Sequence, residues 1–278
     1  MRLRACAIAA WVSCSAPAAQ LDMAHSPAAA RDAINSWARR QTAGHIDHLL
    51  PDGALKAGTR LVPVAALHLQ ATWPKPLRKD TSGTSVFHQT PDTTMHPSQM
   101  LHATLQAPYA DSRSATAIRL AYKNPAFSLL LVMPKADLTK FAATFDARHF
   151  DELWQSLHSS RVALSMPAFA VKQSLGGLKD LLSQWGMQRA FDQQAQFAIL
   201  QGMPTAITGL YEKATIRVDA QGTEAAAAAA AVVRVTAMPP SQQEPQRFEV
   251  NRPFLFFVVH DSTQTILFAG SVAKPETL

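Results

Sequence analysis

The sequence predicts an α+β fold with mostly antiparallel sheets. Strand and helix patterns are mixed without regular alternation, no repeat recurs at a fixed period, and 47% of the 278 residues are hydrophobic. Regular alternation would have indicated a parallel sheet, and a fixed period would have indicated a repeat protein. A chain of this length and hydrophobicity can bury a sizeable core, as one large domain or two ordinary ones.

The clearest helical pattern covers residues 26–40, SPAAARDAINSWARR. Ser26 suits the N-cap, Pro27 suits the first helical position, and apolar residues then recur at helical spacing. Gly44 is placed to end the helix. Two further amphipathic helices are predicted for residues 145–158 and 175–186.

A long apolar run with branched side chains, residues 59–73, predicts a buried strand. Pro63 fits poorly inside a central strand because proline has no N–H to donate. Further strands are predicted by short apolar or alternating runs at residues 117–122, 127–134, 161–169 and 208–222, with two more strands in residues 253–272.

The formal net charge is +6, but the basic residues are dispersed. No basic stripe with interleaved aromatic residues occurs, so we expect a mildly basic surface and no nucleic-acid partner. P-loop, GxGxxG, HExxH and GxSxG motifs are absent. We therefore expect no catalytic residue and no cofactor, and a hydrolytic enzyme is the least favoured class.

Ten histidines raise the question of a metal site. His45 and His48 are three residues apart, and His96 and His102 lie near His88. No Asp, Glu or Cys completes a familiar ligand set at the right spacing. We expect surface or hydrogen-bonded histidines and no metal.

Residues 1–20 have a basic start, an apolar middle and an A-x-A arrangement around Pro17, which is the outline of a secretory signal peptide. The alternative is that residues 1–20 form a segment unrelated to the domain that follows, which comprises residues 21–278. A signal peptide predicts a secreted or periplasmic protein, and its absence a cytoplasmic one. No stretch approaches the roughly 18 apolar residues of a membrane helix, so we expect no membrane span, and we expect a monomer.

Seven consecutive alanines, residues 225–231, lie within GTEAAAAAAAVVRVTAMPP. A helix would have no apolar stripe to bury, and it would run into the β-branched VVRVT segment. In an extended chain, Glu224 and Arg234 share one face, and the other face is small or apolar. No proline occurs between Gly222 and Met238, so every N–H there can join a ladder. The pattern favours a strand, with an alanine-rich surface linker as the alternative.

The segment GTEAAAAAAAVV resembles the proximal hinge of the reactive loop of serpins. Residues 251–275, NRPFLFFVVHDSTQTILFAGSVAKP, are similar to the serpin C-terminal signature, and AINSWARRQTAGHIDHLLP resembles the helix and turn that lie across the main serpin sheet. FSLLLVMPK and GLKDLLSQWGMQRAFD resemble later serpin segments. The resemblance covers roughly residues 21–275 in order.

This resemblance implies a serpin-like fold of mixed sheets with packed helices and an exposed reactive loop, about residues 220–248. It also implies a suicide inhibitor of serine proteases, or sometimes of cysteine proteases. The protease attacks the loop, forms an acyl-enzyme, and is trapped when the cleaved loop inserts into the central sheet. The hinge residues implied are Gly222, Thr223, Glu224, Ala225, Ala226, Ala227 and Ala228.

Counting about fourteen residues from Gly222, as the family pattern implies, places the reactive bond between Thr236 and Ala237. That bond predicts an elastase- or subtilisin-like target. Arg234 is an alternative that would select trypsin-like proteases, and Met238 would select chymotrypsin- or elastase-like ones.

The chain departs from the family pattern in its length and at three positions. Only 25 residues precede Ser26, where serpins carry several helices and strands, so we expect an N-terminally truncated fold. Ala65 replaces an Asn, Glu212 replaces a His, and Ala220 replaces an acidic residue. The alternative function is therefore a non-inhibitory or defective serpin-fold protein, a truncated gene product with a cleavable loop.

Overall fold

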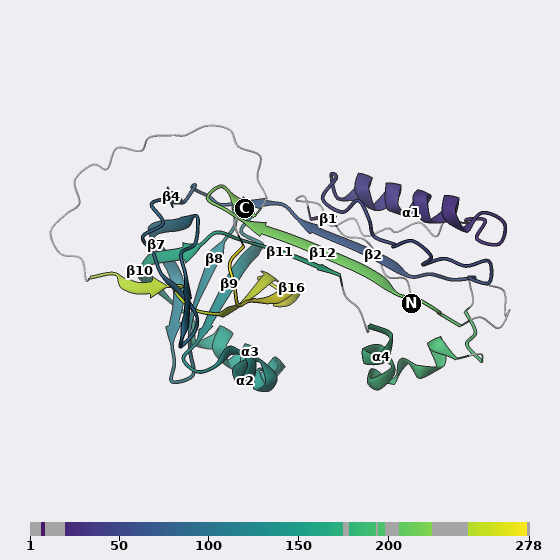
Figure 1. Ribbon diagram of the computed structural model, residues 1–278. Helices are drawn as coiled ribbons and strands as arrows, with labels where there is room; N and C mark the ends of the chain where they lie inside the picture. The colour runs from purple at the N-terminus through teal and green to yellow at the C-terminus, as the bar shows by residue number, and fades with distance from the viewer. Residues whose placement is uncertain are drawn as a thin grey trace. The chain divides into compact units, whose positions relative to one another are not determined.

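The computed structural model describes residues 7–8, 20–174, 178–192, 194–197, 206–223 and 244–276 (Figure 1). The chain forms two compact units. The first comprises Met1–Leu69 and Val171–Ile216, and the second comprises Gln70–Ala170 and Arg217–Leu278. Both units contain strands and helices, as expected for an α+β fold.

The first unit is built on parallel strands covered by a helix. Strand β2 pairs in parallel with β1 on one side and with β12 on the other, and β11 also pairs with β12. Figure 1 shows α1 lying over β2 and β12. The elements that lie in this unit, or begin or end in it, are β1 (Ala7–Ile8), α1 (Pro27–Gln41), β2 (Val64–Leu69), β11 (Phe169–Ser174), α4 (Leu178–Leu182), the π-helical turn η1 (Ser183–Met187), the 3₁₀ turn η2 (Gln188–Phe191) and β12 (Tyr211–Val218).

Helix α1 confirms the predicted helix almost residue for residue. Ser26 occupies the N-cap position, although its side chain makes no cap hydrogen bond, and Pro27 begins the helix. The N–H of Gly44 donates to the Arg39 carbonyl at 2.8 Å with φ 89°, which ends the helix as predicted. The buried face of α1 is made by residues four apart: Ala30, Ile34 and Ala38. It packs against Leu49 and Leu50 of the segment before β2 and against Ala66 of β2.

The second unit is organised by an antiparallel-rich sheet in the order β14-β10-β7-β8-β9-β15-β16, with β4 also on β7. A separate hairpin joins β5 to β6, and β3 and β13 lie in the other large sheet. The bounds are β3 (Ala71–Thr72), β4 (Arg78–Asp80), β5 (Phe87–Thr90), β6 (Thr93–Met95), β7 (Met100–Asp111), β8 (Ala115–Ala121), β9 (Phe127–Pro134), α2 (Leu138–Thr144), α3 (Ala147–Ser156), β10 (His158–Pro167), β13 (Gly222–Thr223), β14 (Gln246–Glu249), β15 (Phe254–His260) and β16 (Thr265–Val272).

The core of this unit lies between the sheet and helices α2 and α3 (Figure 1). Phe150 and Leu153, which lie three residues apart on α3, are buried against the sheet, and the Phe150 ring meets Phe257 edge-on at 5.5 Å. The predicted strand pairs are confirmed here, because β8 pairs with β9 and β15 pairs with β16, both antiparallel.

Two predicted elements are shorter than expected. The strand predicted over residues 59–73 begins only at Val64, directly after Pro63, and is interrupted at Gln70 between β2 and β3. In the helix predicted over residues 175–186, the described α-helical part covers Leu178–Leu182. A π-helical turn follows, and within it Gly186 has φ 94°. Residues 175–177 lie outside the described residues.

Candidate functional site

The predicted loop hinge begins in the sheet that contains β3, β12 and β13. Gly222 and Thr223 form strand β13, which pairs antiparallel with Val218 of β12 on one side. On the other side, Gly222 pairs with Thr72 and Thr223 with Ala71 of β3. The first two predicted hinge residues are therefore already ladder residues between two strands.

Gly222 is required by the space available to it. Its φ is 151°, a backbone conformation that favours glycine. A Cβ atom added here would lie 2.1 Å from the Ala71 carbonyl oxygen and 2.5 Å from the Thr72 Cα. Because both are backbone atoms, no side-chain rotation relieves the clash. The sequence assigned Gly222 the role of a hinge, and the structure adds that the close approach of β3 permits only glycine there.

A hydrogen-bonded turn centred on Asp219 fixes the start of β13. The Asp219 side chain accepts hydrogen bonds from the backbone N–H of Gln221 at 2.7 Å and of Gly222 at 3.3 Å. The Asp219 N–H donates to the Gly222 carbonyl at 2.7 Å. This carboxylate-stabilised turn holds β13 alongside the end of β12.

Two aromatic residues clamp the turn and the hinge. The Trp73 indole N–H donates to the Asp219 carbonyl at 2.9 Å, and the Trp73 backbone N–H donates to the Gln221 carbonyl at 2.9 Å. The rings of Trp73 and Tyr122 stack, with centroids 4.8 Å apart and planes 10° apart. Stacked aromatic pairs of this kind contribute about 0.5–1.5 kcal/mol beyond area burial.

The hydroxyl groups of Tyr122 and Thr223 share a hydrogen bond of 2.7 Å in the protein interior. Thr223 is fully buried, and burial raises the pKa of the Tyr122 phenol, so the phenol stays protonated. Sequence reasoning missed Tyr122 and Trp73 as site residues. Their partners lie about a hundred and more residues away, and local periodicity carries no signal for such pairs.

The far end of the predicted loop is anchored in the same unit. Strand β14 pairs in parallel with β10, with Phe248 opposite Leu164. The Phe248 ring is buried and meets Tyr109 edge-on at 6.3 Å. The remaining predicted loop residues lie outside the described residues, so the hinge positions Glu224, Ala225, Ala226, Ala227 and Ala228 and the reactive-bond candidates Arg234, Thr236, Ala237 and Met238 stay predictions.

In the first unit, β2 and β12 pair directly over five residue pairs. Ala65 lies opposite Glu212 in this register, so two of the three positions that depart from the family pattern are ladder partners. The Glu212 side chain is half-buried, and burial raises the pKa of its carboxyl. The structure therefore pairs a methyl group with a carboxyl where the family resemblance implies an Asn and a His.

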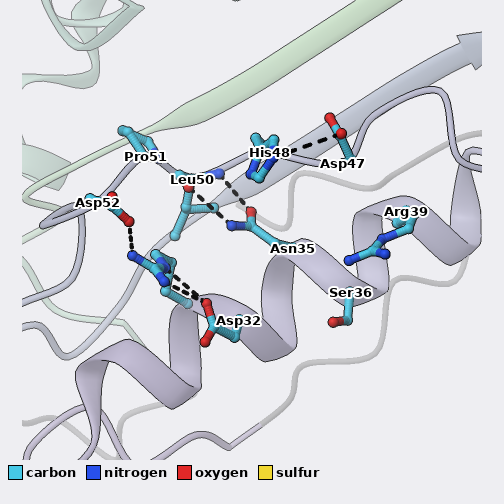
Figure 2. A pocket seen from close by; sticks show the side chains of 10 residues that line it. Asp32, Asn35, Ser36, Arg39, Asp47, His48, Leu50, Pro51 and Asp52 are labelled. Carbon is cyan, nitrogen blue, oxygen red and sulfur yellow. Dashed lines mark hydrogen bonds and ion pairs between the residues drawn. The ribbon is translucent and has the colours of Figure 1, made fainter.

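A hollow of about 370 Å³ lies between α1 and the segment that follows it (Figure 2). Its lining carries both signs of charge, and Arg31 already pairs with Asp32 and Asp52. We assign it no ligand. Among the described residues, no three His, Cys, Asp or Glu side chains gather to form a metal site, and no described helix is long and apolar enough to cross a membrane.

Comparison with known proteins agrees with this architecture. The family model described as Serpin (serine protease inhibitor) matches residues 12–275. An uncharacterized serpin-like protein of Thermococcus kodakarensis is 31% identical over 260 residues, which cover 93% of this chain and 60% of that protein. Human serpin B10 is 33% identical over 257 residues, which cover 88% of this chain and 62% of that protein.

Solved structures show the same fold. Thyroxine-binding globulin in complex with thyroxine superposes with a TM-score of 0.75 at 24% identity, covering 92% of this chain and 67% of that chain. Uncleaved ovalbumin gives a TM-score of 0.74 at 18% identity, covering 92% and 65%.

A mixed-sheet α+β fold and a family-model match over nearly the whole chain define the class. The chain belongs to the serpin family. It spans about 60% of the length of the first curated relatives that it matches.

Proposed function

We propose that this chain inhibits a serine endopeptidase by loop cleavage, acyl-enzyme trapping and insertion of the cleaved loop into the sheet that contains β13. The observation that carries the proposal is the burial of Thr223. Thr223 is 0% exposed and its hydroxyl meets the buried Tyr122 hydroxyl, so the Thr223 face of β13 points inward. If the strand continues past Thr223, Ala225, Ala227 and the later odd-numbered residues share this face, which is small or apolar.

The direction of β13 also supports insertion. It runs antiparallel to the end of β12 and to β3, so a continuation would run antiparallel to β12 and to β2, which precedes β3 along the chain. Insertion would replace the five parallel pairs between β2 and β12 by two antiparallel ladders. Antiparallel ladders are slightly more stable per residue than parallel ones, so the exchange is favourable in direction.

The partner that we propose is a serine protease of the elastase or subtilisin type, which would cleave between Thr236 and Ala237. A trypsin-like protease acting at Arg234, a chymotrypsin- or elastase-like one acting at Met238, and a cysteine protease are the alternatives. The experiment is incubation with one protease of each type, followed by denaturing electrophoresis and mass spectrometry of the released loop fragments. A covalent complex that resists SDS supports inhibition, and complete loop cleavage with no complex contradicts it.

A second candidate is a serpin-fold protein that is cleaved without trapping its protease. The Ala65–Glu212 pair favours this candidate, because a strand inserted between β2 and β12 would bury the half-buried Glu212 carboxyl further, and that desolvation opposes insertion. The two candidates differ in the cleaved protein. Insertion raises the melting temperature after cleavage, whereas a cleaved loop that stays outside the sheet leaves it unchanged or lower.

A further inference from the structure

Residues 42–54, the first part of the segment between α1 and β2, form a strap in the first unit. Hydrogen bonds join the strap to α1 at Leu50 and at Thr42. The Asn35 side chain accepts from the Leu50 N–H at 2.8 Å and donates to the Leu50 carbonyl at 3.0 Å (Figure 2). The Thr42 hydroxyl donates to the Ala38 carbonyl at 2.7 Å.

The strap is also fixed to β12. The Lys213 ammonium donates to the carbonyl of His48, and the Tyr211 hydroxyl donates to the carbonyl of Ala54 at 3.3 Å. Both side chains come from the face of β12 that packs toward α1, because Tyr211 contacts the α1 core.

The strap meets β2 through a stacked pair of imidazole rings. The rings of His45 and His68 have centroids 4.2 Å apart and planes 10° apart. His45 is exposed, and His68, on β2, is 4% exposed. The strands beside β2 place Ala7 and Thr215 opposite His68, and neither residue titrates. The strap is therefore bound to both β2 and β12 and crosses their pairing.

Protonation opposes this stack. Two imidazolium rings at this separation repel each other, and a buried imidazolium loses its hydration. The charged or titratable groups on the packed elements are Lys213 on the same sheet face, Arg39 and Arg40 exposed at the end of α1, and His48 in the strap, whose Nε2 lies 3.8 Å from the Asp47 carboxylate. Burial, with a smaller contribution from His45, lowers the pKa of His68 to about 4.

We propose that the His45–His68 stack is a pH-sensitive latch that holds the strap across the β2–β12 pairing and releases it in acid. The stack is neutral and intact near pH 7. The ordinary pKa of histidine is about 6.5. Below this pH, protonation favours the released strap, because the His68 ring is hydrated in the released state. The consequence for inhibition rests on the proposed function: insertion must separate β2 from β12, so a released strap allows faster insertion.

The size of the effect follows from proton linkage. If His68 has a pKa of about 4 in the latched state and an ordinary value of about 6.5 when released, the opening constant rises about tenfold between pH 7.5 and pH 5.5. The same shift gives almost no change between pH 8.5 and pH 7.5. The response is therefore confined to mildly acidic solution.

Hydrogen–deuterium exchange on the intact, uncleaved chain tests the latch without any protease. Exchange in residues 42–50 is compared at pH 7.5 and 5.5, after correction for intrinsic chemistry, in the wild type, His68→Phe and His48→Gln. His68→Phe keeps a stacked ring that cannot be protonated. His48→Gln is the matched control, because it removes a titrating ring from the strap outside the stack. We expect the acid response, about tenfold, in the wild type and His48→Gln and its loss in His68→Phe.

An equal rise in His68→Phe, or no rise in the wild type, overturns the latch. If His68→Phe does not fold, His68→Gln is used, which also lacks a ring that can be protonated; it should lose the rise, and an unchanged rise counts against the proposal. Protease trapping is scored separately. An acid response without any trapped complex leaves the latch in place and contradicts the proposed inhibition.

Discussion

The Tyr122 and Thr223 hydroxyl groups lie 2.7 Å apart in the interior, where the chain enters its predicted reactive loop. The two residues are separated by 101 positions in the sequence, and each is almost fully buried. This contact joins the residue that follows β8 to the predicted hinge, and the Tyr122 ring that makes it also stacks on Trp73.

Removing either hydroxyl should destabilise the protein. Tyr122→Phe or Thr223→Val leaves one buried hydroxyl without its partner, which costs about 1–3 kcal/mol in the free energy of unfolding. The double variant should lose clearly less than the sum of the two, because both polar groups are gone. Urea denaturation of the four proteins measures this. Strict additivity would show that the two hydroxyls do not interact in solution.

Gly222→Ala should be strongly destabilising. The added Cβ meets two backbone atoms of β3 at 2.1 and 2.5 Å, so we expect a loss of at least about 2 kcal/mol. Gly58→Ala is the matched control, because a Cβ there meets no atom within 4 Å. Equal melting temperatures for the two variants would contradict the close approach of β3 to Gly222.

Thr223→Arg should abolish trapping while leaving the loop cleavable. The inward face of β13 has no room for a guanidinium and no water to solvate it, so insertion stalls at its first step. The expected result is a full yield of cleaved chain and no SDS-resistant complex. Thr94→Arg, at an exposed position on β6, should trap as the unmodified chain does. Persistent trapping by Thr223→Arg would refute insertion through β13.

The stability contributed by Glu212 should fall as the pH rises. Burial raises the pKa of this carboxyl in the folded chain, so the folded state binds more protons than the unfolded state above pH 4.5. Stability is therefore fully present below the ordinary pKa and is lost as the carboxyl ionises. Glu212→Gln should be more stable than the unmodified chain at pH 7, with the gain disappearing toward pH 4.

Thermal melts at several pH values measure that gain. Glu249→Gln, at an exposed position on β14, serves as the control and should change little. A Glu212→Gln gain of the same size at every pH would point to a cause other than ionisation.

The sequence predicted the elements whose signals are local. The helix at residues 26–40 follows from its apolar spacing and capping residues, and β15 and β16 follow from two apolar runs around a polar turn. These features depend on residues within a few positions of one another.

The clamp and the latch could not be predicted in this way. In the sequence Trp73 is only the end of an apolar run, whereas its indole N–H donates to the carbonyl of Asp219, 146 residues later. The spacing of His45 and His48 raises the question of a metal site, whereas the stacking partner of His45 is His68 on another element. Such pairs depend on strand register and on the path of the strap, which no local pattern specifies.

Because β13 is already paired in its sheet, the rate of the proposed insertion depends on a different step. Starting a new strand inside a sheet normally requires an unfavourable search, because chain entropy is lost before ladder bonds form. Here Gly222 and Thr223 are already paired with β3 in the uncleaved chain. Insertion would then be elongation from a preformed seed, with a rate set by how fast β2 and β12 separate and not by how long the cleaved end takes to find the sheet.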